Sequence, residues 1–210
     1  MTLHAFIAAK AAIHMGTGAR TLIIVFSRPA IPGRAKTRLI PRLGAWRAAL
    51  LHARLTERAL RTARAAGCGK VELQGRQQRG SDLGERMFNA FRRALRRHQR
   101  VVLIGTDCPV LRPADLRRAA RLLCGACDAV LAPAEDGGYA LIALKKVRGE
   151  LFESIEWGGN SVLRNTLLKF ESLGWKVRLL RTVWDLDRPE DLDRFRSLRF
   201  SSDRRRAARR

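Results

Sequence analysis

Residues 21–39 read TLIIVFSRPAIPGRAKTRL, an apolar run that leads into a basic loop. The run at 21–26 is almost entirely apolar, which is typical of a strand covered on both faces in a parallel sheet. The loop that follows carries three cations and a threonine beside a Pro-Gly turn: Arg34, Lys36, Thr37 and Arg38. No Asp or Glu occurs before Glu57, so no nearby residue in the sequence neutralises this loop.

Strands and helices are expected to alternate along the rest of the chain. Beyond 21–26, we expect strands at 71–73, 101–105, 128–132, 138–144 and 176–181, and helices at 44–66, 83–97, from Pro113 on, at 149–155, 160–173 and 189–198. Residues 27–43 are expected to form a long loop. The alternation predicts an α/β fold, a three-layer α/β/α sandwich with a mostly parallel, mixed sheet. Ligands bind such sheets at the carboxyl ends of the strands, and the polar motifs of this chain follow strands.

The length of 210 residues fits one domain, which we place at 21–200. Residues 1–20 are then an N-terminal extension and residues 201–210 a basic tail. No apolar run approaches the roughly 18 residues that would span a bilayer, and the start lacks the basic segment of a signal peptide. Without a secretory signal the four cysteines are expected to be reduced thiols, so we expect a cytoplasmic protein.

The net charge of +23 calls for anionic partners or a solvated basic surface. One interpretation is solvated helix faces plus a basic tail, with nucleic acid bound only adventitiously at low salt. The alternative is a nucleic-acid-binding basic protein. Aromatic residues make up only 6% of the chain, which disfavours a stacking surface for single strands.

The basic loop has the residues of a phosphate site, although it is not a Walker loop, because no Lys directly follows Gly33. Gly33 lets backbone N–H groups approach an anion. Arg34, Lys36 and Arg38 can then direct three cationic groups at one polyphosphate. The alternative is a solvated basic loop.

Two acidic segments are candidates for holding a divalent cation. Asp107 directly follows the apolar strand at 101–105, at the sheet edge where ligands bind. Asp185 and Asp187 are two residues apart and point the same way in an extended segment. Asp187 is favoured as the second ligand, but it also makes a good N-cap with Glu190 as its capping-box partner.

Two further loops are candidates for contacts with a ligand. In PAEDGG (133–138), the glycines suit either close approach to a ligand or a tight turn. In QRGSD (78–82), Gln78 and Gly80 precede a helix whose free N–H groups could bind a base or phosphate. Asp82 and Glu85 predict a capping box at that helix start. His4, His14, His52 and His98 lie outside these loops, so a histidine-based acid/base mechanism is not expected.

These motifs, in this order, resemble a known family. The segments are FSRPAIPGRAKTRL (26–39), QRGSDLGERM (78–87), VVLIGTDCPVL (101–111), DAVLAPAEDGGYALIAL (128–144), LFESIEW (151–157) and WDLDRPEDL (184–192). They resemble the bacterial radical-SAM/selenodomain-associated transferase 1 family, which has a glycosyltransferase-A-like, nucleotide-diphospho-sugar-transferase-like fold. More remotely, the chain is similar to phospholactate and molybdenum-cofactor guanylyltransferases. It departs from the family in a short middle and in GGN (158–160), where a Ser or Thr is more usual.

The resemblance implies a metal-dependent transferase that uses an NTP or a nucleotide-sugar and a small acceptor, by nucleotidyl or glycosyl transfer. A non-catalytic homologue of this fold is the alternative. The resemblance implies these roles: phosphate binding by Gly33, Arg34, Lys36 and Arg38; Mg²⁺ or Mn²⁺ binding by Asp107 and Asp187; a place near the base for Gln78, Gly80 and Asp82; and a place near the acceptor for Asp136, Gly137 and Gly138. Lys36, Arg38 and Asp107 are the candidate catalytic residues.

Overall fold

The computed structural model describes residues 20–197, which fold around one six-stranded sheet. The strands are β1 (Thr21–Phe26), β2 (Lys70–Gln74), β3 (Arg100–Ile104), β4 (Ala129–Pro133), β5 (Tyr139–Leu144) and β6 (Val177–Leu179). Their order in the sheet is β2-β1-β3-β5-β4-β6. β5 is antiparallel to both of its neighbours, and the other pairs are parallel. The predicted mixed, mostly parallel sheet is confirmed.

The helices of the structure are α2 (Ile40–Leu43), α3 (Ala45–Ala66), α4 (Leu83–Leu95), α5 (Pro113–Leu122), α6 (Val162–Ser172), and the 3₁₀ turns η1 (Thr37–Leu39) and η2 (Gly149–Leu151). Residues 189–197 are also helical. Two predictions are wrong. Residues 27–43 are not a plain loop, because η1 and α2 form there, with a proline in the first turn of α2. The helix predicted at 149–155 is only the turn η2, and Ser154 beyond it has a left-handed backbone (φ 56°) that no helix continues through.

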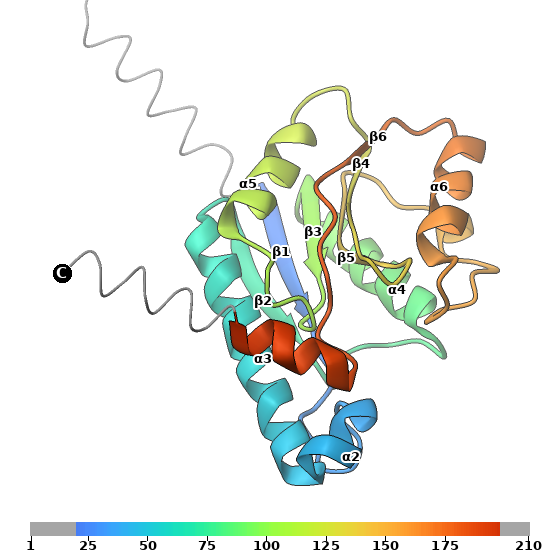
Figure 1. Cartoon of the computed structure of the whole chain (residues 1–210). Coiled ribbons are helices and arrows are strands. Elements are labelled where there is room, and N and C mark those ends of the chain that lie inside the picture. The colour runs from blue at the N-terminus through green and yellow to red at the C-terminus, as the bar shows by residue number, and fades with distance from the viewer. Residues whose placement is uncertain (1–19, 198–210) are drawn as a thin grey trace, which may run out of the picture.

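Helices cover both faces of the sheet (Figure 1). Alternate residues of β1 pack into the two cores on either side. Ile23 and Val25 pack with buried residues of α3 and α5. Leu22 and Ile24 pack on the other face with α4 and α6, where Phe91 and Phe170 are large, fully buried side chains. A strand buried on both faces reads as a continuous apolar run, which is why β1 was recognisable from sequence.

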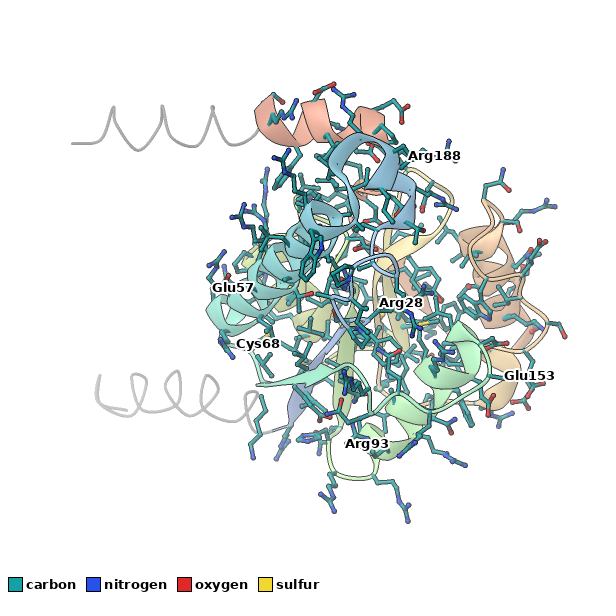
Figure 2. The ribbon with its side chains drawn as sticks, turned by 90° about the horizontal axis from the view of Figure 1, so that it is seen from below. Arg28, Glu57, Cys68, Arg93, Glu153 and Arg188 are labelled. Carbon is teal, nitrogen blue, oxygen red and sulfur yellow. The ribbon has the colours of Figure 1, made fainter. Side chains whose placement is uncertain are left out.

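The strand directions bring the polar loops to one edge of the sheet. β1, β2, β3, β4 and β6 all end at this edge, while the antiparallel β5 begins there. In Figure 1 it is the lower edge, where α2 and the red helix of residues 189–197 lie. Figure 2 views the molecule from this side, with Arg28 near the middle of the view. In the sheet, β2 lies on one side of β1 and β3 lies on the other. The connections from β1 to β2 and from β2 to β3 therefore run in opposite directions across the sheet, and a topological switch point lies between β1 and β3.

The predicted N-terminal extension (1–20), apart from Arg20, and the predicted basic tail (201–210) lie outside the described residues. The domain boundaries therefore stay a prediction. Within residues 20–197, no helix is both long and apolar enough to cross a membrane.

Both predicted capping boxes form differently in the structure. Asp82 caps α4 by accepting from the Glu85 N–H at 2.8 Å, as expected. The Glu85 carboxylate bonds the N–H and hydroxyl of Ser81 instead of the Asp82 N–H. At the last helix, Asp191 rather than Glu190 reaches back, and it accepts from the N–H of Asp187 at 2.9 Å and from that of the next residue at 2.7 Å. The side chain of Asp187 is thereby free for other partners.

Asp128 ties three strands together at the opposite edge of the sheet. It accepts from the Lys176 N–H at 2.9 Å, and its other oxygen lies 3.4 Å from Lys145 Nζ and 3.1 Å from Lys146 Nζ. Burial raises the pKa of Asp128, but the Lys176 hydrogen bond and the two ammonium groups outweigh burial and hold this pKa below its usual value.

Because its pKa is lowered, the ionised Asp128 should add to the free energy of unfolding at neutral pH, and this contribution should be lost in acid. Asp128→Asn keeps an acceptor for Lys176 but loses the charge, so the variant should be less stable than the wild type above about pH 4, the usual range of an aspartate. The difference should disappear as the pH falls through the lower pKa of the folded state. Urea unfolding of both proteins across this range measures it. A difference that persists unchanged in acid would contradict the prediction.

Candidate functional site

The basic loop and the acid after β3 meet at the carboxyl edge of the sheet. Lys36 Nζ lies 2.8 Å from Asp107 Oδ1 and 3.7 Å from Asp187 Oδ1, and the Lys36 side chain is only 2% exposed. Its ammonium group also donates to the backbone carbonyl of Leu186. The Leu186 N–H in turn donates to the Asp107 carbonyl at 2.7 Å, so the two segments are joined through backbone as well. The three candidate residues from distant parts of the sequence therefore share one location.

Lys36 is held in an uncommon backbone conformation. Its φ of 50° and ψ of 46° are left-handed, which is rare for a residue other than Gly, Asn or Asp. Such a conformation costs about 1–3 kcal/mol and persists only where surrounding contacts enforce it. Here η1 begins directly after Lys36, and the two carboxylates and one carbonyl fix its ammonium group. Strain of this kind clusters at functional sites.

The other members of the basic loop are more exposed. Arg38 pairs with the second oxygen of Asp187. Arg34 is exposed and, within the described part of the chain, has no ion pair. Gly33 has a φ of +79° and open space where a Cβ would stand, so its backbone conformation, not crowding, calls for glycine. The loop thus presents one buried cation and two outer ones.

The acidic side of the site includes a carboxylate oxygen without a partner. Asp185 Oδ1 is buried and accepts no hydrogen bond from any residue between 20 and 197. Burial, and then the neighbouring carboxylates of Asp107 and Asp136, raise the pKa of Asp185 to about 7. Asp187, which the sequence favoured as metal ligand, is already engaged by Lys36 and Arg38. The unsatisfied acceptor is therefore on Asp185.

The carboxylates suit a divalent ion that arrives with a nucleotide. Within residues 20–197, no three His, Cys, Asp or Glu side chains form a group ready to hold a metal. Mg²⁺, however, is usually bound by one or two carboxylates, with water and substrate phosphates as its other ligands. Asp107 and Asp185 supply such oxygens, and among the described residues the buried Asp185 Oδ1 has no hydrogen-bond partner. The residues present fit this mode of binding.

The residues expected near the base all have structural partners. The Gln78 amide donates to the carbonyls of Ser27 and Gln74, at 2.9 Å each. Gly80 (φ +140°) lies against the backbone at the start of α4, where a Cβ would be 2.7 Å from the Arg86 nitrogen. These contacts, with the Asp82 cap, hold the loop between β2 and α4. A contact of this loop with a base stays a prediction.

The loop at 133–138 forms the tight turn between β4 and β5. Gly138 N–H donates to Asp136 Oδ1 at 2.9 Å, and Ala134 N–H donates to the Gly138 carbonyl, also at 2.9 Å. Gly137 has a φ of +88°, and a Cβ there would lie 2.0 Å from the Asn160 carbonyl oxygen. The close approach that its glycine permits is therefore to residue 160 of the same chain. A role of this turn toward an acceptor stays a prediction.

The structure places a buried histidine at the site, although no role was expected for a histidine from the sequence. His52 on α3 is 6% exposed, and its Nδ1 lies 3.9 Å from Asp107 Oδ1. A helix, not a motif loop, carries it to the site. Its position in the sequence does indicate burial, because His52 lies four residues after Ala48 and three before Leu55. At this helical spacing the three residues share the buried face of α3.

A nucleophilic cysteine is disfavoured next to Asp107. Burial raises the pKa of the Cys108 thiol to about 12, with a further contribution from Asp185. A thiol with so high a pKa is not ionised at neutral pH, and only the thiolate is a good nucleophile.

The chain is similar to solved structures of several other proteins. A protein from Desulfovibrio desulfuricans G20, provisionally named a nucleotide-diphospho-sugar transferase, is 29% identical and has a TM-score of 0.73. The alignment covers 81% of this chain and 83% of that protein. Rv0371c from Mycobacterium tuberculosis H37Rv is 19% identical with a TM-score of 0.51, over 85% of this chain and 97% of its own. These likenesses show that the fold is that of the nucleotide-diphospho-sugar transferases.

A third structure, CMP:2-keto-3-deoxy-manno-octonic acid synthetase complexed with CTP, is 14% identical with a TM-score of 0.49, over 87% of this chain and 99% of its own. That likeness is too distant to support any argument. No protein with a curated description matches the chain. A family model described as an uncharacterized protein conserved in bacteria, DUF2064, matches residues 39–159, more than half of the sequence, and the chain therefore belongs to this family.

Proposed function

We propose that the protein is a divalent-metal-dependent transferase that uses a nucleotide and acts on a small acceptor. The observation that carries this proposal is the meeting of Lys36 with Asp107 and Asp187 at the carboxyl edge of the sheet. Cations and carboxylates side by side at this edge suit a metal-bound polyphosphate, which needs both. The fold supports the proposal, because its relative from Desulfovibrio desulfuricans G20 is provisionally named a nucleotide-diphospho-sugar transferase.

In this proposal the basic loop binds the phosphates. The Lys36 ammonium neutralises phosphate charge from inside the site, while Arg38 and Arg34 reach the phosphates from its rim. Asp107 would hold the metal together with Asp187 or Asp185, and the Asp185 Oδ1 atom without a hydrogen-bond partner among the described residues favours Asp185. When bound, Mg²⁺ or Mn²⁺ would neutralise the negative charge that develops on the leaving phosphate. The rate then depends on positioning and charge neutralisation, without a covalent intermediate.

Two reaction types remain within the proposal. In nucleotidyl transfer, an acceptor oxygen attacks the α-phosphorus of an NTP and pyrophosphate leaves. In glycosyl transfer, the acceptor attacks the anomeric carbon of a nucleotide-sugar and the nucleoside diphosphate leaves. Both release a diphosphate whose negative charge must be neutralised, so the same residues would serve both. The proposal includes membership of the radical-SAM/selenodomain-associated transferase 1 group and a cytoplasmic location.

The base and the acceptor are assigned to two other loops at the same edge of the sheet. We assign Gln78, Gly80 and Asp82 to the surroundings of the base. Asp136, Gly137 and Gly138 are assigned to the acceptor side, and the effect of Asp136 on the Asp185 pKa supports the nearness of this turn to the acids.

A thermal-shift screen tests the proposed function. The purified protein would be heated with NTPs and nucleotide-sugars, with and without Mg²⁺ or Mn²⁺. A ligand at a hundredfold excess over its Kd stabilises the folded state by ~2.7 kcal/mol, which for a chain of this size raises Tm by about 5–10 °C. We expect such a rise for at least one nucleotide with metal, and a clearly smaller rise without it. If no nucleotide in the set raises Tm, the proposal fails.

A second candidate function is nucleic-acid binding. It is favoured by a hollow of about 730 Å³ along α4 that four arginines line together with Asn89: Arg79, Arg92, Arg93 and Arg96. Arg93 is already paired with Glu72 at 2.6 Å. Phosphate contacts of this kind weaken steeply with salt. Binding of duplex DNA or RNA that survives physiological salt would support this second function, and binding lost by about 0.2 M salt would leave it adventitious.

A further inference from the structure

His52 lies beneath the start of the basic loop, where it contacts two residues that directly follow β1. Its Nε2 is 2.9 Å from the Arg28 carbonyl oxygen and 3.3 Å from Ser27 Oγ. The Ser27 hydroxyl donates to the same Arg28 carbonyl at 3.0 Å and lies 3.0 Å from Thr56 Oγ1. Three side chains and one carbonyl thus form a compact polar cluster under the loop, and His52 and Ser27 are each only 6% exposed.

The cluster determines which nitrogen of His52 carries the proton. A carbonyl oxygen only accepts hydrogen bonds, so Nε2 at 2.9 Å must donate to Arg28. In the neutral imidazole, Nδ1 then carries a lone pair. Nδ1 faces Asp107 Oδ1 at 3.9 Å, which is beyond hydrogen-bond distance.

This assignment excludes a nucleophile triad, although the order Ser27, His52 and Asp107 resembles one. A triad base must offer its Nε2 lone pair to the serine and its Nδ1–H to the carboxylate. Here Nε2–H is directed at the Arg28 carbonyl, and the Ser27 hydroxyl is directed there too. His52 therefore acts on the site through another group.

We propose that His52 is a positioning residue that fixes the basic loop by its Nε2–H bond to the Arg28 carbonyl; this deepens the proposed function and rests on it. The loop can transmit that constraint, because Ile31 holds its far end. The Arg34 and Ala35 N–H groups both donate to the Ile31 carbonyl at 3.0 Å, directly before Lys36. Fixing Arg28 thus fixes the place where Lys36 enters the site and meets Asp107.

The tautomer is tested directly by nitrogen NMR of the imidazole rings. The chain has four histidines, so the His52 signals are assigned by comparison with His52→Gln. At mildly alkaline pH we expect a proton on Nε2 and none on Nδ1. A proton on Nδ1 would overturn the proposal, because the bond to Arg28 would then be impossible.

The positioning role is tested by amide hydrogen exchange in three variants, without any ligand. His52→Leu removes the bond to Arg28, while Gln places its amide donor where Nε2 stood. We expect the Ala35 amide to exchange about tenfold faster in His52→Leu, the effect of losing one hydrogen bond, and at the wild-type rate in His52→Gln. Thr56→Val is the matched control, since it removes the neighbouring Thr56–Ser27 bond and leaves the Arg28 carbonyl bond intact. Equal exchange in all three variants would overturn the proposal.

Binding of inorganic pyrophosphate with Mg²⁺ links this role to the site. By calorimetry we expect about tenfold weaker binding in His52→Leu, recovered in His52→Gln, with each variant first shown to be folded by its Tm. Full binding by His52→Leu, or no recovery in His52→Gln, would overturn the positioning role. If the wild type binds neither pyrophosphate nor any nucleotide, the proposed function fails instead, and the exchange and NMR results still decide whether His52 fixes the loop.

Discussion

Asp107→Asn is expected to weaken the binding of a nucleotide in the presence of Mg²⁺ by about hundredfold or more. Loss of groups that merely support a metal ligand costs about 10–100-fold, and loss of a ligand's charge should cost at least as much. The substitution keeps the shape of the side chain and an acceptor for Lys36 Nζ, which lies 2.8 Å away. The loss should therefore concern the metal rather than the position of the lysine.

The same substitution should have the opposite effect when metal is absent. Asp107 then only repels the phosphates that Lys36 attracts, so its neutralisation should leave metal-free binding equal or tighter. Lys36→Ala should differ by weakening nucleotide binding with and without metal, since its ammonium acts on the phosphates themselves. Calorimetry on the two variants, with EDTA and with Mg²⁺, separates the two patterns.

The matched control for this experiment is Asp128→Asn. It removes the same charge from an aspartate that is likewise paired with lysines, but at the far edge of the sheet. Its nucleotide affinity should equal that of the wild type. If Asp107→Asn retains full Mg²⁺-dependent affinity, Asp107 does not hold the metal.

The sheet could be predicted from sequence because each of its central strands carries its own signal. β1 and β3 are buried along their whole length, and such strands appear as unbroken apolar runs. The predicted bounds of β1 agree with the structure, and those of α3 do so to within one residue. The turn η2 was mistaken for a helix, because the left-handed backbone of Ser154 has no mark in the sequence.

The candidate site was only partly predictable, because its details depend on contacts between distant residues. The sequence placed Lys36 and Asp107 after two apolar strands, at whose carboxyl ends ligands bind, and the structure shows that these strands are neighbours. The sequence favoured Asp187 over Asp185 as a metal ligand, but it could not show that Arg38 pairs with Asp187 or that Asp185 is buried. His52 was set aside because a helix carries it, and only the packing of α3 brings it to Asp107.

Gly137→Ala is expected to be the most destabilising of the substitutions considered. Its φ of +88° disfavours any side chain by about 1–2 kcal/mol. In addition, the new Cβ would lie 2.0 Å from the oxygen and 2.6 Å from the carbon of the Asn160 carbonyl, which are backbone atoms that cannot turn aside. Overpacking of this kind adds about 1–3 kcal/mol, so we expect a total loss of about 2–5 kcal/mol in the free energy of unfolding.

Gly158→Ala separates the two causes, because Gly158 has nearly the same φ, +91°, with no atom within 4 Å of its Cβ position. Only the conformational cost of about 1–2 kcal/mol should remain there. Urea unfolding of both variants measures the difference. The Gly137 carbonyl accepts from the Leu163 N–H at 2.8 Å, so the turn and the start of α6 should loosen together. If the two variants lose equal stability, the glycine is required for its backbone angle alone, and the turn would be free to approach an acceptor as the sequence first indicated.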